Sequence, residues 1–588
     1  MTPEILLERS TTVIQVEQMI ASKSPQFFDK SPLITRPTLS LLKRLFHESE
    51  VNQFLEKNHG CVGFEFIDRV LDHFNFSYQV SQVDRRNIPA SGRVMIIANH
   101  PLGALDGLAL LRLIGEIRPD VKIVANDLLM GFDGLKKLVL PVDNLGGKTG
   151  RQQLKAIMSC LHNEEAVIIF PAGEVSRMSP SGVKDQQWNQ NYLKLAQKTN
   201  SPLLPVHIGG RNSMLFYTSS ILYRPLSTIQ LANEMFRQRN RKIPMQVGQA
   251  IPIQELAQLP LSDKEKNKLV KRHLYRIAKG RKPLLKTEKT VEHPQNRQLI
   301  KQELKLAEHL GSTKDNKQIY LFDYDPMSVT MKEIGRLREI AFRKVGEGTG
   351  ERSDLDKFDQ YYRHLILWDE EELEIVGAYR IGEVASYMKS DTPNRIYSAE
   401  LFQYSCDMEP YFEQGIELGR SFIQPKYWGK RSLDYLWYGI GAYLDKHPEI
   451  RYMFGPVSLS NSYPQVAKDF IVSFYKLYFA DKEHLARSFT PYQVNAEHAD
   501  IISDIFSGQD YEEDFRLLKE QLSHFGASVP TLFKQYSELC EPGGVRFLDF
   551  GVDADFGYCV DGLVLVDLNT VKEAKNKRYR GHNSGTQA

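Results

Sequence analysis

The sequence predicts two domains of the α/β class in one chain. The 588 residues are too many for one hydrophobic core, so two or more domains are expected. From residue 91 onward, short β-rich runs alternate with helical stretches, which is typical of a mostly parallel sheet. A second alternation begins after residue 318, beyond a polar stretch. Hydrophobic residues at 42% and charged residues at 25% exclude extensive disorder.

The first alternation starts with the strand 93–99, which leads into a helix at 105–116. Further strands are predicted at 121–126, 138–143, 166–170 and 202–208, and further helices near 149–162 and 186–199.

The second alternation starts with a helix at 328–344. Strands are predicted at 364–369, 374–382, 414–423, 451–459 and 562–568, and a helix near 431–446. We therefore expect a first domain at 1–290, a linker at 291–318, a second domain at 319–570 and a basic, disordered tail at 571–588.

The formal net charge of +2 hides a strong division between the two halves. Residues 1–310 carry 43 Lys and Arg against 29 Asp and Glu, whereas the other 278 residues carry 32 against 44. Residues 264–289 alone hold eleven Lys and Arg. This segment is either a solvated helix and linker or a helix docked on anionic lipid. The division predicts two modules with different partners, and we expect no nucleic acid among them.

Other features narrow the class of protein. The five cysteines have no regular spacing, which predicts reduced thiols in a cytosolic protein, and no metal site is expected. The N-terminal segment has no signal-peptide pattern, and no apolar run is long enough to span a bilayer. If the protein meets a membrane, we expect it to lie on the surface.

The first candidate site follows the strand 93–99, where His100 opens the segment ANHPLGALDG. Ligand and catalytic sites in α/β sheets lie at the carboxyl ends of strands. Pro101 and Gly103 predict a tight turn that brings Asp106 back toward His100. A carboxylate on one imidazole nitrogen fixes the tautomer, so that the other nitrogen can take a proton from a hydroxyl. The alternative is a turn-capping histidine with an aspartate in the first helical turn.

This segment resembles the His-to-Asp motif of the lysophospholipid and glycerophosphate acyltransferases, with five rather than four intervening residues. That spacing is similar to the subgroup of ornithine- and glycine-lipid O-acyltransferases and the so-called hemolysins. FPAGEVSR (170–177), GKTGR (147–151) and LLPVHIGG (203–210) resemble further blocks of the family, in family order. The resemblance implies an acyl thioester donor and an acceptor hydroxyl deprotonated by His100. The acceptor-binding residues it implies are Arg151, Gly173, Glu174 and Arg177.

The second candidate site lies in the segment 416–444, which reads as a strand, a turn and an apolar helix. Backbone N–H groups at a helix start bind anions such as the phosphate of phosphopantetheine. The candidate residues at that turn are Gln424, Gly429, Lys430 and Arg431, with Lys426 as a further cation for a docking protein. An ordinary charged turn is the alternative.

The order of weak blocks over 320–568 resembles the acetyltransferase-like (GNAT) superfamily, and within it the ornithine-lipid N-acyltransferases and homoserine-lactone synthases. The family fold is α+β, and its amine acceptor attacks the thioester directly. Glu417 is the candidate base for the α-amine, and Arg420 the candidate for holding a carboxylate or the thioester end. Asp356 and Asp359 either bind a cationic side chain or are solvated charges on a helix face.

Together the two domains resemble bifunctional ornithine lipid synthases. This implies N-acylation of ornithine with a 3-hydroxyacyl group from acyl carrier protein, followed by O-acylation of the resulting lyso-ornithine lipid. Acyl carrier protein is then a co-substrate, with no bound cofactor, and the place of action is the inner face of a bacterial cell membrane with an anionic surface. Glycine or lysophosphatidate as acceptor, and a non-catalytic membrane-binding or hemolysin-like protein, stay open as alternatives.

Overall fold

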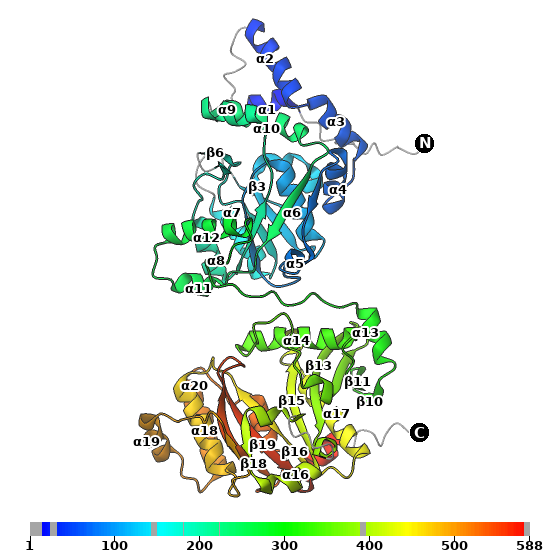
Figure 1. The fold of residues 1–588 in the computed structure, drawn as a ribbon, viewed down its shortest axis with the longest axis vertical. Coiled ribbons are helices and arrows are strands. Elements are labelled where there is room, and N and C mark those ends of the chain that lie inside the picture. The colour runs from blue at the N-terminus through cyan, green and yellow to red at the C-terminus, as the bar shows by residue number, and fades with distance from the viewer. Residues whose placement is uncertain are drawn as a thin grey trace, which may run out of the picture. The chain divides into compact units, whose positions relative to one another are not determined.

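The computed structural model describes residues 15–23, 32–142, 150–179, 182–222, 224–388 and 395–580. Contacts divide the chain into two compact units, residues 1–290 and 291–588. Figure 1 shows each unit as a sheet covered by helices. No helix in the described part of the chain has both the length and the apolar character needed to cross a membrane.

The first unit is built on a seven-stranded sheet in the order β1-β9-β8-β2-β5-β3-β4. All neighbouring strands are parallel except β8 and β9, as the βα alternation predicts. The strands are β1 (Ser77–Gln79), β2 (Val94–Ala98), β3 (Val121–Asn126), β4 (Val139–Val142), β5 (Ala166–Ile169), β8 (Leu203–Ile208) and β9 (Lys242–Val247).

Helices cover both faces of this sheet because its central strands are apolar on both sides. One apolar core joins the sheet to α4 (Phe64–His73) and α6 (Ala104–Gly115). A second core joins the other face to α7 (Arg151–His162), α8 (Asn191–Thr199), α11 (Ile253–Gln258) and α12 (Asp263–Ile277). The remaining helices of the unit are α1 (Val16–Lys23), α2 (Pro32–Leu45), α3 (Glu48–Lys57), α5 (Gln82–Arg85), α9 (Met214–Leu222) and α10 (Arg224–Arg237).

The second unit is built on an eight-stranded sheet in the order β10-β11-β12-β13-β15-β16-β19-β18. Its neighbours are antiparallel except β15 and β16, which are parallel. The strands are β10 (Glu308–Ser312), β11 (Lys317–Phe322), β12 (Arg363–Asp369), β13 (Glu374–Glu383), β15 (Gly415–Ile423), β16 (Tyr452–Leu459), β18 (Val545–Asp553) and β19 (Cys559–Asp567).

Different helices cover the two faces of the second sheet. The larger apolar core holds α17 (Ser432–Lys446), α18 (Gln465–Phe479), α20 (Tyr511–His524) and α21 (Thr531–Ser537). A smaller core holds α13 (Arg297–Leu304) and α14 (Val329–Val345). The remaining helices that the structure describes in this unit are α15 (Val384–Met388), α16 (Glu409–Glu413), α19 (Ala496–Ile505) and α22 (Glu573–Tyr579).

Three expectations about the segments are wrong. The expected linker 291–318 holds α13 and the edge strand β10, so it belongs to the second unit. The expected disordered tail from 571 begins with α22, whose Tyr579 is buried near Trp437 of α17, while 581–588 lie outside the described residues. The helix expected from 186 begins at Asn191, because a hairpin of β6 (Arg177–Ser179) and β7 (Gly182–Lys184) precedes it.

The basic segment 264–289 is only partly a solvated face. Its helix α12 buries Lys266, His273 and Leu274 against the sheet. Lys271 donates two hydrogen bonds to backbone carbonyls, at 2.8 Å to Asp185 and 2.6 Å to Gln186. One side of the helix thus packs on the unit, and the basic residues Lys264, Lys268 and Arg272 on its other side are exposed.

Candidate active sites

His100 lies at the carboxyl end of β2, as predicted, and Asp106 lies in the first turn of α6. The chain reverses between them at Gly103, whose φ of 112° suits glycine. His100 Nδ1 lies 3.0 Å from Asp106 Oδ1. The other carboxylate oxygen accepts a hydrogen bond from Leu102 N at 2.8 Å, so the carboxylate is fixed. The Asp106 side chain is fully buried, whereas that of His100 keeps 20% exposure.

A second carboxylate, Asp185, organises this site, although no sequence motif pointed to it. Its Oδ1 accepts from His100 N at 3.2 Å and from Ser176 Oγ at 2.5 Å, and its Oδ2 accepts from Trp188 Nε1 at 2.8 Å. Burial disfavours protonated His100, but the charges of Asp106 and Asp185 outweigh burial and raise the pKa of His100. An imidazole held in this way can accept a proton at Nε2 and is stabilised once it has done so.

The block 170–177 packs against His100. The ring of Phe170 stacks on the His100 ring with 4.2 Å between centroids, and Ser176 N donates to His100 O at 2.7 Å. Gly173 forms the turn of this block. Arg177 donates to Glu174 Oε2 at 3.0–3.1 Å, so the two candidate acceptor-binding residues form an ion pair with each other.

Arg151 is exposed at the first turn of α7. It is the last residue of the motif GKTGR, of which 147–149 lie outside the described residues.

An apolar cavity of about 120 Å³ adjoins α6, the helix that follows His100 in the chain. Ala104 and Leu108 of α6 form part of its wall. The other walls come from α3, α4 and α10, with the residues Phe54, Phe66, Val70 and Phe236. A cavity of this chemistry accepts hydrocarbon and excludes water.

In the second unit the parallel strands β15 and β16 separate along their length. Their register runs from Gly415↔Tyr452 to Glu417↔Phe454 and stops there. Beyond this point, β15 contains a bulge, where Arg420 at φ 49° and Ser421 lie opposite Tyr379 alone. The facing edges of Leu418–Ile423 and Gly455–Leu459 are not paired with each other, so backbone N–H groups there are available to a ligand.

Glu417, expected to act as a base, is buried and fully engaged. Its carboxylate accepts from the Tyr362 hydroxyl, from Tyr397 N at 3.0 Å and from Ser398 N at 2.8 Å. Burial raises the pKa of Glu417 even though these hydrogen bonds oppose the rise. The side chain is 1% exposed, so it anchors the segment at 397–398 and is closed to an amine.

Asp356 and Asp359 are neutralised by buried arginines of the same unit. One interpretation of this pair from the sequence is a site for a cationic substrate. Arg380 Nη1 lies 2.8 Å and 2.9 Å from the two Asp356 oxygens, and Arg338 Nη2 lies 2.7 Å from Asp359 Oδ1. Burial opposes ionisation of Asp359, but Arg338 and Arg380 outweigh it and lower the pKa of that carboxyl. Both interpretations of these two residues are therefore wrong, because they form neither a free acidic site nor solvated charges on a helix face.

Arg420 closes this cluster on the side of the separated strands. Its guanidinium approaches Asp356 Oδ2 at 3.5 Å and Asp354 Oδ2 at 3.9 Å. The same group lies over the rings of Tyr397 and Phe556, at 5.0 and 4.7 Å from their centroids. These cation–π contacts hold Arg420 at the bulge.

The predicted anion-binding turn lies at the start of α17. Gly429, Lys430 and Arg431 are exposed there, and Arg431 is the N-cap residue. Gln424 instead donates to Ile375 O at 2.7 Å, which fixes the end of β15 to β13. Lys426 is paired with Glu374, so Lys430 and Arg431 are the cations left at this helix start.

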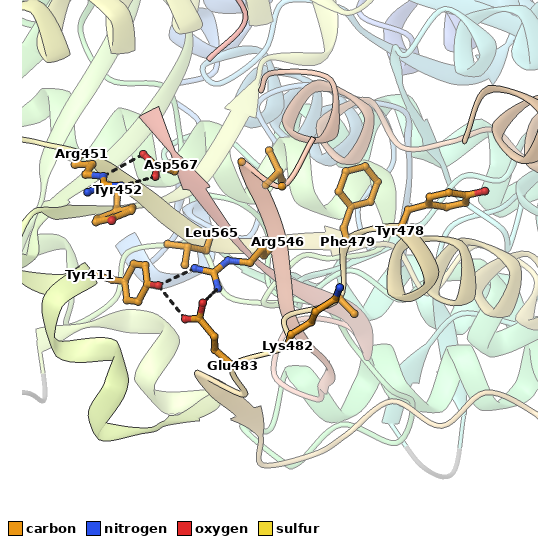
Figure 2. Close-up of a pocket in the computed structure, with 14 residues that line it drawn as sticks. Tyr411, Arg451, Tyr452, Tyr478, Phe479, Lys482, Glu483, Arg546, Leu565 and Asp567 are labelled. Carbon is orange, nitrogen blue, oxygen red and sulfur yellow. Dashed lines mark hydrogen bonds and ion pairs between the residues drawn. The ribbon is translucent and has the colours of Figure 1, made fainter. Parts of the chain in front are cut away.

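A cavity of about 570 Å³ lies at the start of β16 and β18. Figure 2 shows Arg546 contacting Tyr411 and Glu483, and Arg451 contacting Asp567. These charges neutralise one another, and the cavity lies at the opposite end of β16 from the strand separation. It is not the predicted site.

Comparisons with known proteins agree with this two-part architecture. An acyltransferase family model matches residues 18–281, and an acetyltransferase (GNAT) domain model matches residues 337–438. A glycine N(alpha)-acyltransferase of Phocaeicola vulgatus is 30% identical over 300 residues, which cover 49% of this chain and 91% of the relative.

Two further relatives are acyltransferases as well. A lyso-glycine lipid O-acyltransferase of Bacteroides thetaiotaomicron is 29% identical over 256 residues, covering 42% of this chain and 92% of the relative. An L-ornithine N(alpha)-acyltransferase of Rhodobacter capsulatus is 28% identical over 265 residues, covering 42% of this chain and 88% of the relative.

The fold and the matches define an acyltransferase enzyme with two domains. The chain belongs to the acyltransferases, with an acyltransferase domain in its N-terminal unit and a GNAT domain in its C-terminal unit.

Proposed function

We propose that the chain makes a phosphorus-free aminolipid in two acyl transfers, one in each unit. The GNAT unit transfers a 3-hydroxyacyl group from acyl carrier protein to the α-amine of an amino acid, and the first unit acylates the resulting 3-hydroxyl. The observation that carries the proposal is the buried Asp106–His100 pair in a chain that also holds a GNAT domain. No cofactor is needed, because both donors are thioesters.

In the first unit, His100 Nε2 takes the proton of the lyso-lipid hydroxyl while its oxygen attacks the thioester carbonyl. Asp106 stabilises the imidazolium that forms, and the expelled thiolate takes up a proton. The apolar cavity beside α6 is available to a fatty acyl chain. Glu174 and Arg177 lie in the block that contacts His100 and are the proposed contacts for the polar head.

In the second unit, the thioester enters between β15 and β16. The unpaired N–H groups near the Arg420 bulge are the proposed donors to the carbonyl oxygen as negative charge develops on it. The start of α17, with Lys430 and Arg431, is the proposed site for the phosphopantetheine phosphate and for acyl carrier protein.

Ornithine is our first candidate for the amino acid, because the order of sequence blocks resembles the bifunctional ornithine lipid synthases and an ornithine N-acyltransferase is among the relatives. Glycine is the second candidate, because relatives for glycine N-acylation and lyso-glycine lipid O-acylation are matched over nearly their whole length.

Purified protein incubated with a 3-hydroxyacyl thioester of acyl carrier protein and, in separate reactions, ornithine, glycine or lysophosphatidate tests the choice. We expect N-acyl-ornithine as the main product. N-acylglycine as the main product would replace ornithine by glycine, and lysophosphatidate acylation without either amide would contradict the N-acyl step. Formation of no acylated product with any of these acceptors would contradict the proposed function.

A further inference from the structure

A group of buried carboxylates in the second unit has no role in the sites described so far. Asp561 on β19 and Asp553 at the end of β18 are 3% and 6% exposed, and Glu347 follows α14 at 8% exposure. They lie where β16 and β18 end and β19 begins, next to the loop that follows α14.

The register of the sheet places Asp561 on the same face as Glu417. Glu417 is the partner of Phe454, and Asp561 is the partner of Ser458. Side chains alternate along a strand, so Phe454 and Ser458, four residues apart on β16, point to one face. Glu417 lies where β15 and β16 are still paired with each other. Asp561 lies at the level where these two strands have separated.

Contacts tie this acidic group to the Arg420 bulge. The turn between β18 and β19 carries Phe556, whose ring lies under the Arg420 guanidinium at 4.7 Å. Tyr397, which also stacks on Arg420, donates from its hydroxyl to Asp553 Oδ2 at 3.4 Å. The carboxylates therefore adjoin the place where the thioester carbonyl is proposed to lie.

The Glu347 backbone is rigidly held. Gly346 ends α14 at φ 82°, and Glu347 N donates to Phe342 O at 2.9 Å. The loop continues to Thr349 and Gly350, whose N–H groups donate to the buried Glu339 carboxylate at 3.1 and 3.0 Å. On the other side the turn at Gly557 approaches Gly346 O so closely that a Cβ there would lie 2.2 Å from it.

The Glu347 carboxylate itself is free to meet a ligand. It makes no hydrogen bond or ion pair to any residue that the structure describes, although the residue is more than nine-tenths buried. This differs from Glu417, which accepts three hydrogen bonds, and from Asp356 and Asp359, which face arginines. A buried carboxylate without a partner is unfavourable unless it is protonated or meets a cation.

The electrostatics of the group suit proton transfer near neutral pH. Burial and the charge of Asp561 raise the pKa of Glu347 to about 7. Burial, with Asp553 adding and Ser458 and Arg420 opposing, raises the pKa of Asp561 to about 6. The charge of Glu347 in turn contributes to raising the pKa of Tyr463 and of the Cys559 thiol. A general base works best when its pKa is near the working pH.

We propose that Glu347 is the catalytic base of N-acyl transfer, and that Asp561 is a positioning residue that tunes it. The inference rests on the N-acylation proposed above. Glu347 takes a proton from the α-ammonium of the amino acid, and the freed nitrogen lone pair attacks the thioester carbonyl. The C–N bond forms, the C–S bond breaks, and a second proton of the amine passes to the departing thiolate. Protonated Glu347 then returns its proton to solvent.

The first test compares purified full-length wild type with Glu347→Gln, and uses Asp555→Asn as the control. Asp555 is exposed in the same β18–β19 turn, so its variant removes an acid without touching the proposed base. We expect kcat for N-acylation to fall at least 100-fold in Glu347→Gln and to stay within threefold of wild type in Asp555→Asn. A loss of less than tenfold in Glu347→Gln would overturn the inference.

The same preparations separate this inference from the proposed function. Each protein is also given a synthetic N-(3-hydroxyacyl) amino acid and an acyl thioester, so that only the first unit is assayed. We expect Glu347→Gln to keep this O-acylation. A wild type that N-acylates no amino acid would refute the proposed function, whereas an active Glu347→Gln would refute only the assignment of the base.

A second variant tests the assignment without removing the base. Asp561→Asn removes the charge that raises the Glu347 pKa, so the acidic limb of kcat against pH is expected to move to lower pH. Glu347→Asp is expected to restore part of the activity of Glu347→Gln. An acidic limb that stays at the wild-type pH in Asp561→Asn, in a protein with wild-type thermal unfolding, would contradict the coupling.

Discussion

At the residue scale, the N-terminal site depends on two carboxylates that hold one histidine. Asp106 was predictable, because a turn after a buried strand brings a nearby acid back to the strand end. Asp185 was not, because it is 85 residues from His100 and no pattern in the sequence pairs it with Ser176 and Trp188. The pair of His100 and Asp106 is therefore predictable from the sequence, whereas Asp185, which helps to orient His100, is brought to it only by the tertiary fold.

Asp185→Asn is expected to shift the pH dependence of O-acylation. His100 acts as a base only when it is neutral, so the rate rises as pH passes upward through its pKa. Asp185 helps to raise that pKa, and removing its charge should move the acidic limb to lower pH. The pH profile of kcat with a synthetic lyso-lipid measures the shift. An unchanged profile would show that Asp185 does not act on His100 through charge.

The residue scale also shows why Glu417 was misjudged from the sequence. An acid on a strand next to a helix start satisfies the pattern of a base, but the pattern carries no information about burial. The Tyr362 hydroxyl and the two N–H groups that occupy Glu417 come from segments up to 55 residues away.

At the element scale, α14, β13 and β15 are held together by buried charges. Arg338, Arg380 and Arg420 come from these three elements and meet Asp354, Asp356 and Asp359 on the segment before β12. Burying such a cluster is costly, but breaking it leaves charges without partners.

Arg380→Met is expected to destabilise the second unit by about 3–5 kcal/mol, because Asp356 and Asp359 lose a buried partner. Denaturant unfolding followed by fluorescence measures the change. The control is Arg516→Met on the exposed face of α20, where no measurable change is expected. Equal stability of the two variants would show that the buried cluster contributes nothing to the fold.

The sequence predicted those elements whose hydrophobic pattern is strong. The strands from β2 to β5, the helix α6, the strands β12, β13, β15 and β16, and the helix α17 lie within a few residues of their predicted positions. The bulge at Arg420 was beyond prediction, since a non-glycine residue at positive φ leaves no mark in the pattern. The edge strand β10 was missed because its sequence EHLGS is polar and short.

At the scale of the whole molecule, we keep the interpretation that the oppositely charged halves have different partners. The structure changes this interpretation only at the basic helix α12. The basic helix α12 is part of the first unit's core on one side. Its exposed residues Lys264, Lys268 and Arg272 are four apart and form one stripe, which is the face we propose for contact with an anionic membrane.

Neutralising this stripe is expected to weaken membrane binding. The triple change Lys264→Gln, Lys268→Gln and Arg272→Gln should reduce binding to anionic lipid vesicles by about fivefold for each charge removed. Vesicle cosedimentation at fixed ionic strength measures it, and vesicles of zwitterionic lipid serve as the control. Undiminished binding to anionic vesicles would place the membrane contact elsewhere on the unit.

The proposed base also has a consequence for overall stability. Glu347 ionises at about pH 7 in the folded protein but near pH 4.3 when unfolded. The folded state therefore loses stability as pH rises between these values, and the full penalty is present above about pH 7. Glu347→Gln should raise the free energy of unfolding by on the order of 1–3 kcal/mol at pH 8, with the gain vanishing near pH 4. Thermal unfolding at both pH values checks this, and a destabilised variant at pH 8 would contradict the free carboxylate.

The most direct test of two transfers in one chain is lipid mass spectrometry after expression in a bacterial strain that makes no aminolipid. We predict that the wild type yields a doubly acylated aminolipid, whereas His100→Ala accumulates the singly acylated N-acyl amino acid. Doubly acylated lipid at the wild-type level in His100→Ala would contradict the account.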